Sequence, residues 1–411
     1  MTKKLVRNLI FFIIIIVFTS IVIVYNNTKN NEKENNFPKG EKNTPEIEET
    51  TLPTNSITAS PEVIPTFVPE PTEEIKEKKK VKARALFLSG WTMGSADNLD
   101  HYTKLANETE INSYVIDIKG DGGILSYESQ IPLVKEINSW ENKFYPEKVI
   151  TQLHDNDIYV IGRIVCFKDP ILSSKRPDLA IKNSSGGLFF KNGITWLNPY
   201  NKDSWVYLVD IAKEAIELGF DEIQFDYIRF PAGGEKSGMY FGDVEKKKYE
   251  IINEFLAYAR EEMPDAVLSA DVFGIILESP KDTEHIGQYL ELIGKDIDYI
   301  CPMLYPSHYA RGQVVNEVRF SKPDLDPYGV VYNTLMKAKK RLQEVDDYQA
   351  EMRPYLQDFT ASWIGSGNYM RYGAEQVRQQ IKAVYDAGYE EWILWDASNT
   401  YSESAFKKEG E

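Results

Sequence analysis

The pattern of apolar and polar positions changes at about residue 82. After this point, short apolar runs rich in β-branched and aromatic residues alternate with stretches in which apolar residues recur every three or four positions. The first pattern predicts buried strands and the second predicts amphipathic helices. The predicted strands cover residues 83–90, 113–119, 158–167, 222–230, 266–273, 299–305, 353–359 and 392–397.

Helical periodicity fills the intervals between these strands. Helices are predicted over residues 146–154, 204–218, 243–262, 283–293, 328–342 and 374–387. Asp203 is the expected N-cap of the second helix, and Gly219 is expected to end it. Eight strands with helices between them predict a parallel (β/α)₈ TIM barrel over residues 83–405. A doubly wound open sheet is the second choice, because no Gly-x-Gly-x-x-Gly or phosphate-loop motif opens a helix.

Residues 168–202 form the longest insertion in the predicted barrel. They follow the third strand and contain Gly186-Gly187 and Phe189-Phe190. The strand that precedes them points its C-terminal end toward the face where barrels carry active sites. We therefore expect this insertion to form a hairpin or a lid on that face.

The first 82 residues do not share the barrel pattern. Residues 9–25 are a mostly apolar run of 17 residues preceded by Lys3, Lys4 and Arg7, which predicts a transmembrane anchor over residues 1–25 with the C-terminal part exported. A cleaved signal peptide, and hence a secreted protein, is the alternative. Residues 26–82 are rich in Pro, Thr, Glu and Lys, which predicts a disordered, extended stalk. The expected location is the cell membrane, single-pass, with an extracellular C-terminal domain.

Charge and cysteine content narrow the classes of partner. The net charge is −16, so nucleic acid is an unfavourable partner and a neutral or cationic substrate is favoured. The chain has two cysteines, Cys166 and Cys301, which fall on different predicted strands. We expect them to be buried core residues rather than a disulfide.

Carboxylates recur near the C-terminal ends of the predicted strands. Asp226 lies near the end of the fourth strand and Asp271 near the end of the fifth. Neighbouring strands are about 4.8 Å apart, so the two carboxyl groups are expected to approach the roughly 5 Å separation of a retaining glycosidase pair. Asp226 is the predicted nucleophile or charge stabiliser. Asp271 is the predicted general acid, with a pKa raised by burial and by Asp226.

A structural ion pair is the alternative interpretation of each of these carboxylates. Buried Asp beside Arg often closes a layer of a barrel. Asp117, with Lys119 or Arg163 near it, fits that interpretation better than a catalytic one.

Other chemistries receive less support from the sequence. The four histidines, His101, His154, His285 and His308, have no metal-ligand spacing, and no Gly-x-Ser-x-Gly elbow is present. We therefore expect no metal and no cofactor.

Several segments resemble the putative glycosyl hydrolase domain family, a group of bacterial barrel proteins. The similar segments are residues 221–231, Ser269-Ala-Asp-Val-Phe-Gly274, Cys301-Pro-Met-Leu-Tyr-Pro306 and Trp395-Asp-Ala397. The resemblance spans most of residues 81–405 and implies a TIM barrel that acts as a glycosidase.

A more distant resemblance is to the chitinase-like barrels. Their fourth-strand motif is Asp-x-x-Asp-x-Asp-x-Glu, and Asp221, Gln224, Asp226 and Ile228 occupy the four spaced positions here. Ile228 replaces the catalytic Glu, so the mechanism of that family does not carry over. The resemblance implies a barrel and a sugar-facing Tyr305.

These observations predict a glycoside hydrolase that acts on a cell-wall or extracellular polysaccharide. The alternative is a catalytically inactive barrel that binds wall glycan. Side chains expected to contact the substrate lie at or near strand ends: Trp91, Gln224, Arg229, Tyr305, Gln357, Asp358 and Trp395.

Overall fold

The computed structural model describes residues 80–233 and 238–408. Its centre is a closed parallel barrel, in which every strand pairs with the strand that follows it along the barrel and the last pairs with the first. The strands are β1 (Arg84–Leu88), β2 (Ser113–Lys119), β3 (Tyr159–Val165), β5 (Glu222–Asp226), β7 (Val267–Phe273), β8 (Tyr299–Met303), β12 (Tyr355–Gln357) and β13 (Trp392–Trp395). A two-residue strand, β11 (Glu351–Met352), precedes β12 in the chain, and both strands pair with β8. The predicted TIM-barrel architecture is therefore confirmed.

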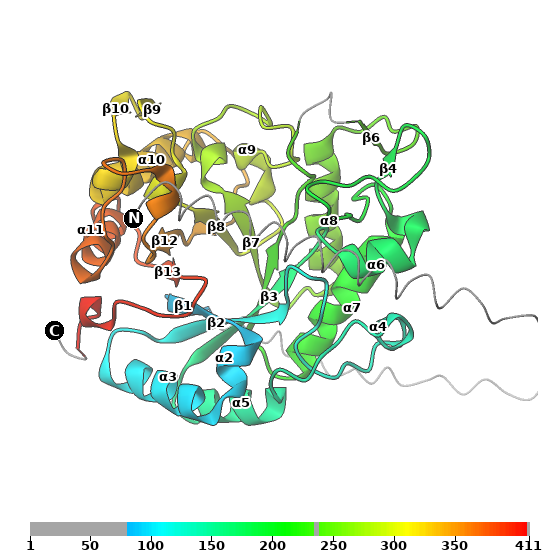
Figure 1. Cartoon of the computed structure of the whole chain (residues 1–411), viewed down its shortest axis with the longest axis horizontal. Helices are drawn as coiled ribbons and strands as arrows, with labels where there is room; N and C mark the ends of the chain where they lie inside the picture. Colours follow the sequence, from blue (N-terminus) through cyan, green and yellow to red (C-terminus); the bar gives the residue numbers. More distant parts are fainter. Residues whose placement is uncertain (1–79, 234–237, 409–411) are drawn as a thin grey trace, which may run out of the picture. The chain divides into compact units, whose positions relative to one another are not determined.

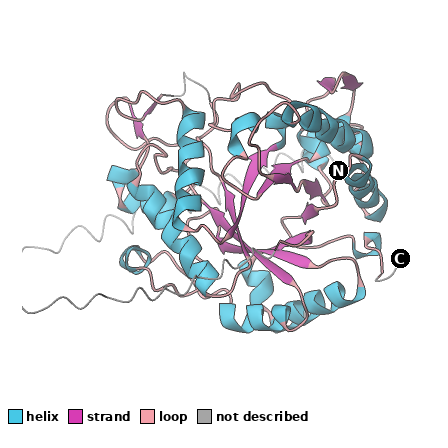
Figure 2. Ribbon diagram, turned by 180° about the vertical axis from the view of Figure 1, so that it is seen from behind, coloured by secondary structure: helices cyan, strands magenta, loops and turns pink. Residues whose placement is uncertain are grey.

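Helices surround the strands on all sides, as Figures 1 and 2 show from opposite faces. They are α2 (Gly90–Gly94), α3 (Ala96–Glu108), α4 (Pro132–Ile137), α5 (Pro146–His154), α6 (Pro170–Lys175), α7 (Asp203–Glu217), α8 (Lys248–Glu262), α9 (Leu290–Ile293), α10 (Pro327–Leu342) and α11 (Ala374–Asp386). Their apolar faces pack against the outward residues of the strands in one large buried cluster. A separate apolar cluster, which includes Ala85, Val115 and Ile161, fills the inside of the barrel.

The alternation of side chains along each strand decides which residues enter the barrel. Asp117 of β2 pairs in register with Arg163 of β3, and Arg163 pairs with Gln224 of β5. Phe225 pairs with Ala270, so the next positions along these strands, Asp226 and Asp271, are neighbours. Polar residues on adjacent strands therefore meet inside the barrel.

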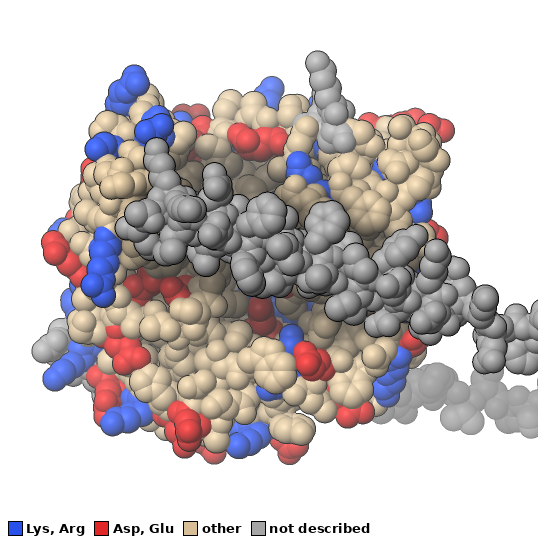
Figure 3. Space-filling model, in the orientation of Figure 1, with Lys and Arg blue, Asp and Glu red and all other residues tan. Residues whose placement is uncertain are grey.

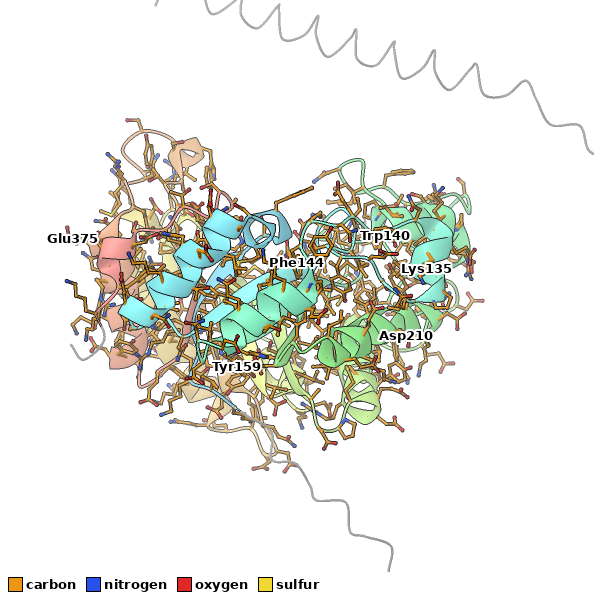
Figure 4. The ribbon with its side chains drawn as sticks, turned by 90° about the horizontal axis from the view of Figure 1, so that it is seen from below. Lys135, Trp140, Phe144, Tyr159, Asp210 and Glu375 are labelled. Atoms are coloured by element: carbon orange, nitrogen blue, oxygen red, sulfur yellow. The ribbon has the colours of Figure 1, made fainter. Side chains whose placement is uncertain are left out.

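Figure 4 gives the direction of the strands. Tyr159, at the start of β3, lies low in this side view, whereas Trp140 and Phe144, in the segment after β2, lie higher. The C-terminal ends of the strands therefore point upward in Figure 4, and toward the viewer in Figure 1. In TIM barrels this end carries the active site.

Several predicted elements are shorter in the structure, and the backbone explains two of these differences. The fourth strand ends at Asp226, because Tyr227 has a left-handed backbone (φ 51°) that breaks the pleat. The helix predicted over 283–293 covers only Leu290–Ile293. The Asp282 carboxylate accepts hydrogen bonds from the backbone N–H groups of Ile286 and Gly287, which removes donors that a helix would need.

The start of α7 also differs from the prediction. Asp203 is the first helical residue rather than the N-cap, which is Lys202. Asn201 supplies the acceptor there, since its side-chain Oδ1 accepts from the Asp203 N–H at 3.0 Å. The predicted stop is present, because Gly219 follows the helix with φ at 103°.

Loops at the C-terminal ends of the strands carry small antiparallel pairs. In the insertion after β3, β4 (Lys182–Asn183) pairs with β6 (Met239–Tyr240) from the loop after β5. After β8, β9 (Gln313–Val315) pairs with β10 (Val318–Phe320). The insertion thus lies on the expected face and is tied to a second loop.

A buried ion network closes the opposite end of the barrel. Arg353 donates from Nη1 to Glu222 at 2.8 Å and from Nε to Glu391 at 2.6 Å. Its guanidinium also stacks on the ring of Tyr299, with 3.6 Å from Cζ to the ring centroid. Glu222 and Arg353 are fully buried, so this network has a structural role.

Two further sequence predictions concern the cysteines and the N-terminal segments. Both cysteines are buried and free. The predicted anchor (1–25) and most of the stalk (26–82) lie outside the described residues. Among the residues that are described, no helix has the length and apolar content needed to cross a membrane.

Candidate active site

A cavity of about 740 Å³ opens at the C-terminal ends of the strands. In Figure 3, which shows the same face as Figure 1, the visible surface is hollowed near its centre and carboxylate atoms lie beside the hollow. The cavity combines acidic and aromatic side chains. It is lined by residues from all eight barrel strands and the loops that follow them, among them Phe87, Asp117, Asp121, Arg163, Asp226, Tyr227, Asp271, Phe273, Met303, Tyr305, His308, Tyr309, Gln313, Tyr355 and Trp395.

Arg163 is the centre of the acidic cluster on the cavity floor. It projects from β3 and donates from Nη1 to Asp117 at 2.5 Å. Its Nε donates to Asp226 Oδ2 at 3.0 Å, and Nη2 pairs with the same oxygen. Asp121 Oδ1 lies 3.5 Å from Nη2. One guanidinium therefore holds carboxylates from two flanking strands and a loop in fixed positions.

Asp226 is the more firmly held member of the predicted pair. Besides the bonds from Arg163, its Oδ1 accepts from the backbone N–H of Tyr227 at 2.5 Å. These donors hold the Asp226 side chain in one orientation at the cavity floor.

Asp271 has the opposite environment. Its side chain is 1% exposed, and neither carboxyl oxygen has a hydrogen-bond partner among the described residues. Burial, and next the charge of Asp226, raise the pKa of Asp271 well above its usual value, while Arg163 opposes the shift. Asp271 Oδ2 is 3.8 Å from Arg163 Nε. The two neighbouring carboxyl groups therefore have environments that push their protonation states apart.

Asp226 and Asp271 share one cationic neighbour, and this limits their separation. Oδ2 of Asp226 is 3.0 Å from Arg163 Nε and Oδ2 of Asp271 is 3.8 Å from the same atom. The two oxygens are therefore no farther apart than the sum of these distances. That limit is compatible with the roughly 5–9.5 Å range of glycosidase carboxyl pairs.

A row of aromatic rings leads from the cavity to the surface. The ring of Trp395 lies 5.8 Å from that of Tyr305 and 5.4 Å from that of Phe359. Phe359 stacks on Trp363 with 5.8 Å between centroids and 15° between planes. Trp363 is 66% exposed, so the ring face turned away from Phe359 is available to a ligand.

The predicted contact residues do not all reach the cavity. Tyr305 and Trp395 line it. Gln224 lies deeper inside the barrel, fully buried, where it accepts from Tyr355 Oη at 2.6 Å and contacts Cys301 Sγ. Gln224 therefore supports the cavity floor from below.

Gln357 and Asp358 are also held by protein groups. Gln357 is fully buried and bonds to Ser307 and Asp324. Asp358 accepts from the N–H and hydroxyl of Ser402, and burial raises its pKa to about 6. Neither side chain lines the cavity.

Trp91 and Arg229 lie at the rim. Trp91 is 59% exposed on α2, directly after β1. The Arg229 guanidinium packs over the rings of Trp196, Tyr227 and Phe273, with Cζ 4.5 Å from the Phe273 centroid. Neither residue is part of the cavity lining, although Tyr227 and Phe273, which Arg229 contacts, are.

Sequence reasoning gave too little weight to Arg163 and Asp117. The predicted pairing of Asp117 with Arg163 is present, and both residues also line the cavity. Lys119, the other proposed partner, instead pairs with Asp169 at 2.9 Å on the outside of the barrel. The alternation of side chains along the strands indicates this. Asp117 pairs in register with Arg163 and Arg163 with Gln224, so all three side chains enter the barrel. Strand alternation does not apply to His308, because it lies in a short 3-10 helix after β8.

Metal binding finds no support in the part of the chain that the structure describes. No group of three or more His, Cys, Asp or Glu side chains there is arranged to hold a metal ion. The absence of a metal from the reaction stays a prediction.

The fold and the site define a TIM-barrel protein of the glycoside hydrolase class. Residues 85–401 match the family described as putative glycosyl hydrolase domain, and the chain belongs to that family. The membership classes the chain as a glycosidase that acts on carbohydrate.

Many solved structures are similar to the chain, among them the following two. A hypothetical protein from Ruminiclostridium thermocellum is 61% identical over 46% of this chain and 97% of its own, with a TM-score of 0.44. The PgaB (BpsB) glycoside hydrolase domain of Bordetella bronchiseptica is 13% identical, with 79% of this chain and 97% of that one covered and a TM-score of 0.57. The second likeness concerns the fold alone. No curated protein matches the chain in sequence.

Proposed function

We propose that this protein is a glycoside hydrolase in which Asp271 is the general acid and Asp226 the nucleophile. The observation that carries the proposal is the contrast between the two carboxyl groups. Asp226 accepts bonds from Arg163 and a backbone N–H, while Asp271 lacks a donor on either oxygen. A structural ion pair would satisfy both groups. A proton donor and a nucleophile require this difference.

The mechanism follows from the positions of these groups. Asp271 donates its proton to the oxygen of the leaving sugar as the glycosidic bond breaks. Asp226 attacks the anomeric carbon and forms a glycosyl-enzyme intermediate. Asp271, now a carboxylate, removes a proton from the water that releases the sugar. Arg163 holds Asp226 in line during both steps.

The substrate we propose is a neutral or cationic polysaccharide of the cell wall or the extracellular matrix. Four aspartates and one arginine among the cavity residues give the site an acidic character, which disfavours polyanionic glycans. Tyr305 and Trp395 offer ring faces for the apolar faces of sugars.

The location we propose is the outer face of the cell membrane. The apolar run at residues 9–25 and the basic residues before it support an anchor with an exported barrel. Protease added to intact cells should digest a C-terminal tag while the protein remains in the membrane fraction. A protease-resistant tag in intact cells would contradict this topology.

The test of hydrolysis is the release of new reducing ends from purified wall glycans and soluble neutral polysaccharides. The wild-type chain should release them, and Asp226→Ala and Asp271→Ala proteins that remain folded should not. Asp178→Ala removes a carboxylate from an exposed surface pair and serves as the matched control. Binding without cleavage across the panel would favour the inactive glycan-binding barrel.

A further inference from the structure

His308 lines the cavity from the loop after β8, and a chain of hydrogen bonds behind it fixes where its proton lies. The chain begins at Asp324, which is 1% exposed. Gln357 donates from Nε2 to Asp324 Oδ1 at 3.1 Å and to the Phe359 carbonyl at 3.0 Å. Two acceptors on this side fix the amide of Gln357 with its nitrogen toward Asp324.

The other side of the Gln357 amide confirms this orientation. Oε1 accepts from the backbone N–H of Ser307 at 3.2 Å, and a backbone N–H is only a donor. Oε1 also lies 2.8 Å from the Ser307 hydroxyl. A carbonyl oxygen cannot donate, so the single hydroxyl hydrogen of Ser307 points to Gln357.

The Ser307 hydroxyl therefore has only lone pairs left for its next neighbour. That neighbour is Nδ1 of His308, at 3.1 Å. A contact of this length between two acceptors would be unfavourable, so the hydrogen must be on Nδ1. In the neutral imidazole the other nitrogen, Nε2, is then an unprotonated acceptor.

The environment of the ring favours the neutral form. The rings of Tyr305 and Phe359 lie 5.2 and 6.3 Å from that of His308. Although His308 is exposed at the cavity, its partial burial lowers its pKa. No described protein group forms a hydrogen bond with Nε2, and Nδ1 is turned toward Ser307. The Nε2 edge therefore remains for the cavity.

We propose that His308 presents an unprotonated Nε2 to the cavity as a fixed hydrogen-bond acceptor for a hydroxyl group of the bound glycan. The identity of the donor rests on the proposed function, whereas the tautomer does not. Ser307, Gln357 and Asp324 are positioning residues that act through His308. A sugar that offers only an acceptor at this point would be rejected, because it would face the Nε2 lone pair.

The tautomer is testable by NMR of the full chain with ¹⁵N-labelled histidine near neutral pH. The chain has four histidines, so the His308→Gln variant assigns the signals of His308. His308 should show a protonated Nδ1 and a bare Nε2. His101 and His154 are internal references with a protonated Nε2, because their Nε2 atoms face carboxylates of Glu403 and Asp221 at 2.7 and 2.9 Å. A protonated Nε2 on His308 would overturn the proposal.

Two variants test the hydrogen-bond chain itself. Ser307→Ala removes the acceptor and should give a mixture of tautomers at His308. Gln357→Leu should reverse the tautomer, because the Ser307 hydroxyl is then free to donate to Nδ1. Ser279→Ala, at an exposed serine bonded to Glu284, should leave the spectrum unchanged. An unchanged tautomer in folded Ser307→Ala and Gln357→Leu proteins would contradict the argument.

The contact with the glycan has its own readout. With any oligosaccharide that the wild-type chain cleaves, His308→Ala should raise KM about three- to tenfold and change kcat by less, as loss of one neutral hydrogen bond predicts. An unchanged KM would overturn the contact. If the wild-type chain cleaves no glycan, the proposed function fails, while the histidine spectrum still decides the tautomer.

Discussion

The carboxyl group of Asp271 lies 3.8 Å from the guanidinium of Arg163 and receives no hydrogen bond from it. Arg163 gives its hydrogen bonds to Asp117, Asp121 and Asp226 instead. Asp271 is therefore close enough to a cation to be held in place, but it pays the cost of burial without the bonds that would favour its charge. This arrangement makes it the carboxyl group of the cluster best suited to keep a proton.

The first prediction contrasts Asp271→Asn with Asp226→Asn. Both should abolish hydrolysis. At neutral pH, Asp271→Asn should raise the melting temperature by a few degrees, because the folded wild type must keep Asp271 protonated at a pH where the unfolded chain ionises it, and Asn removes that cost. Asp226→Asn should lower it, because Arg163 loses its main partner and breaking a buried pair costs roughly 3–5 kcal/mol. Thermal unfolding followed by circular dichroism measures both.

The pH dependence of this contrast has a definite sign. Because the pKa of Asp271 is raised, the folded protein keeps this proton to higher pH than the unfolded chain does. The wild type thus loses stability as pH rises above the unfolded value, at about pH 4, through the folded pKa. The advantage of Asp271→Asn should grow over that window. An advantage that is largest at low pH would contradict the assignment.

The second prediction concerns the pH profile of kcat/KM. A general acid must be protonated, so activity should fall on the alkaline side as Asp271 ionises. The charge of Asp117 contributes to the raised pKa of Asp271. Asp117→Asn should therefore move the alkaline limb to lower pH. Asp178→Asn, which removes the same charge from an exposed surface pair, should leave the limb where it is.

The third prediction concerns chain length of the substrate. Trp363→Ala removes the exposed end of the aromatic row and should weaken binding of long oligosaccharides by about 1–2 kcal/mol, or roughly five- to thirtyfold in KM. Short substrates that occupy only the cavity should be unaffected. Tyr145→Ala, which removes an equally exposed ring outside the cavity lining, is the control. Equal losses for short and long substrates would rule out this role for Trp363.

The fourth prediction concerns stability at the opposite end of the barrel. Arg353→Met leaves Glu222 buried without its partner and should cost roughly 3–5 kcal/mol in the free energy of unfolding. Adding Glu222→Gln should recover part of the loss, because the uncompensated charge is removed. Lys382→Ala breaks an exposed pair with Asp386 and should change stability by less than about 1 kcal/mol. Urea denaturation measures all three, and equal effects of Arg353→Met and Lys382→Ala would contradict the structural role.

The sequence by itself determined the barrel and the strand ends that carry chemistry. Alternation of apolar runs and amphipathic helices is a local property, because each element buries one face or both against its neighbours. It was therefore sufficient to predict the strand 113–119 and the helix 146–154 with the bounds the structure has. It also put Asp226 and Asp271 on adjacent strands.

Only the tertiary structure decided which polar residues reach the cavity and which are held by other protein groups. Gln357 was a predicted contact, yet Ser307, 50 residues away in the sequence, takes its carbonyl oxygen. Conversely, Arg163 becomes the centre of the site only when β2 and β5 flank it. Hydrogen-bond partners in a barrel come from distant segments, and their distances depend on strand register and loop paths, which local periodicity does not encode.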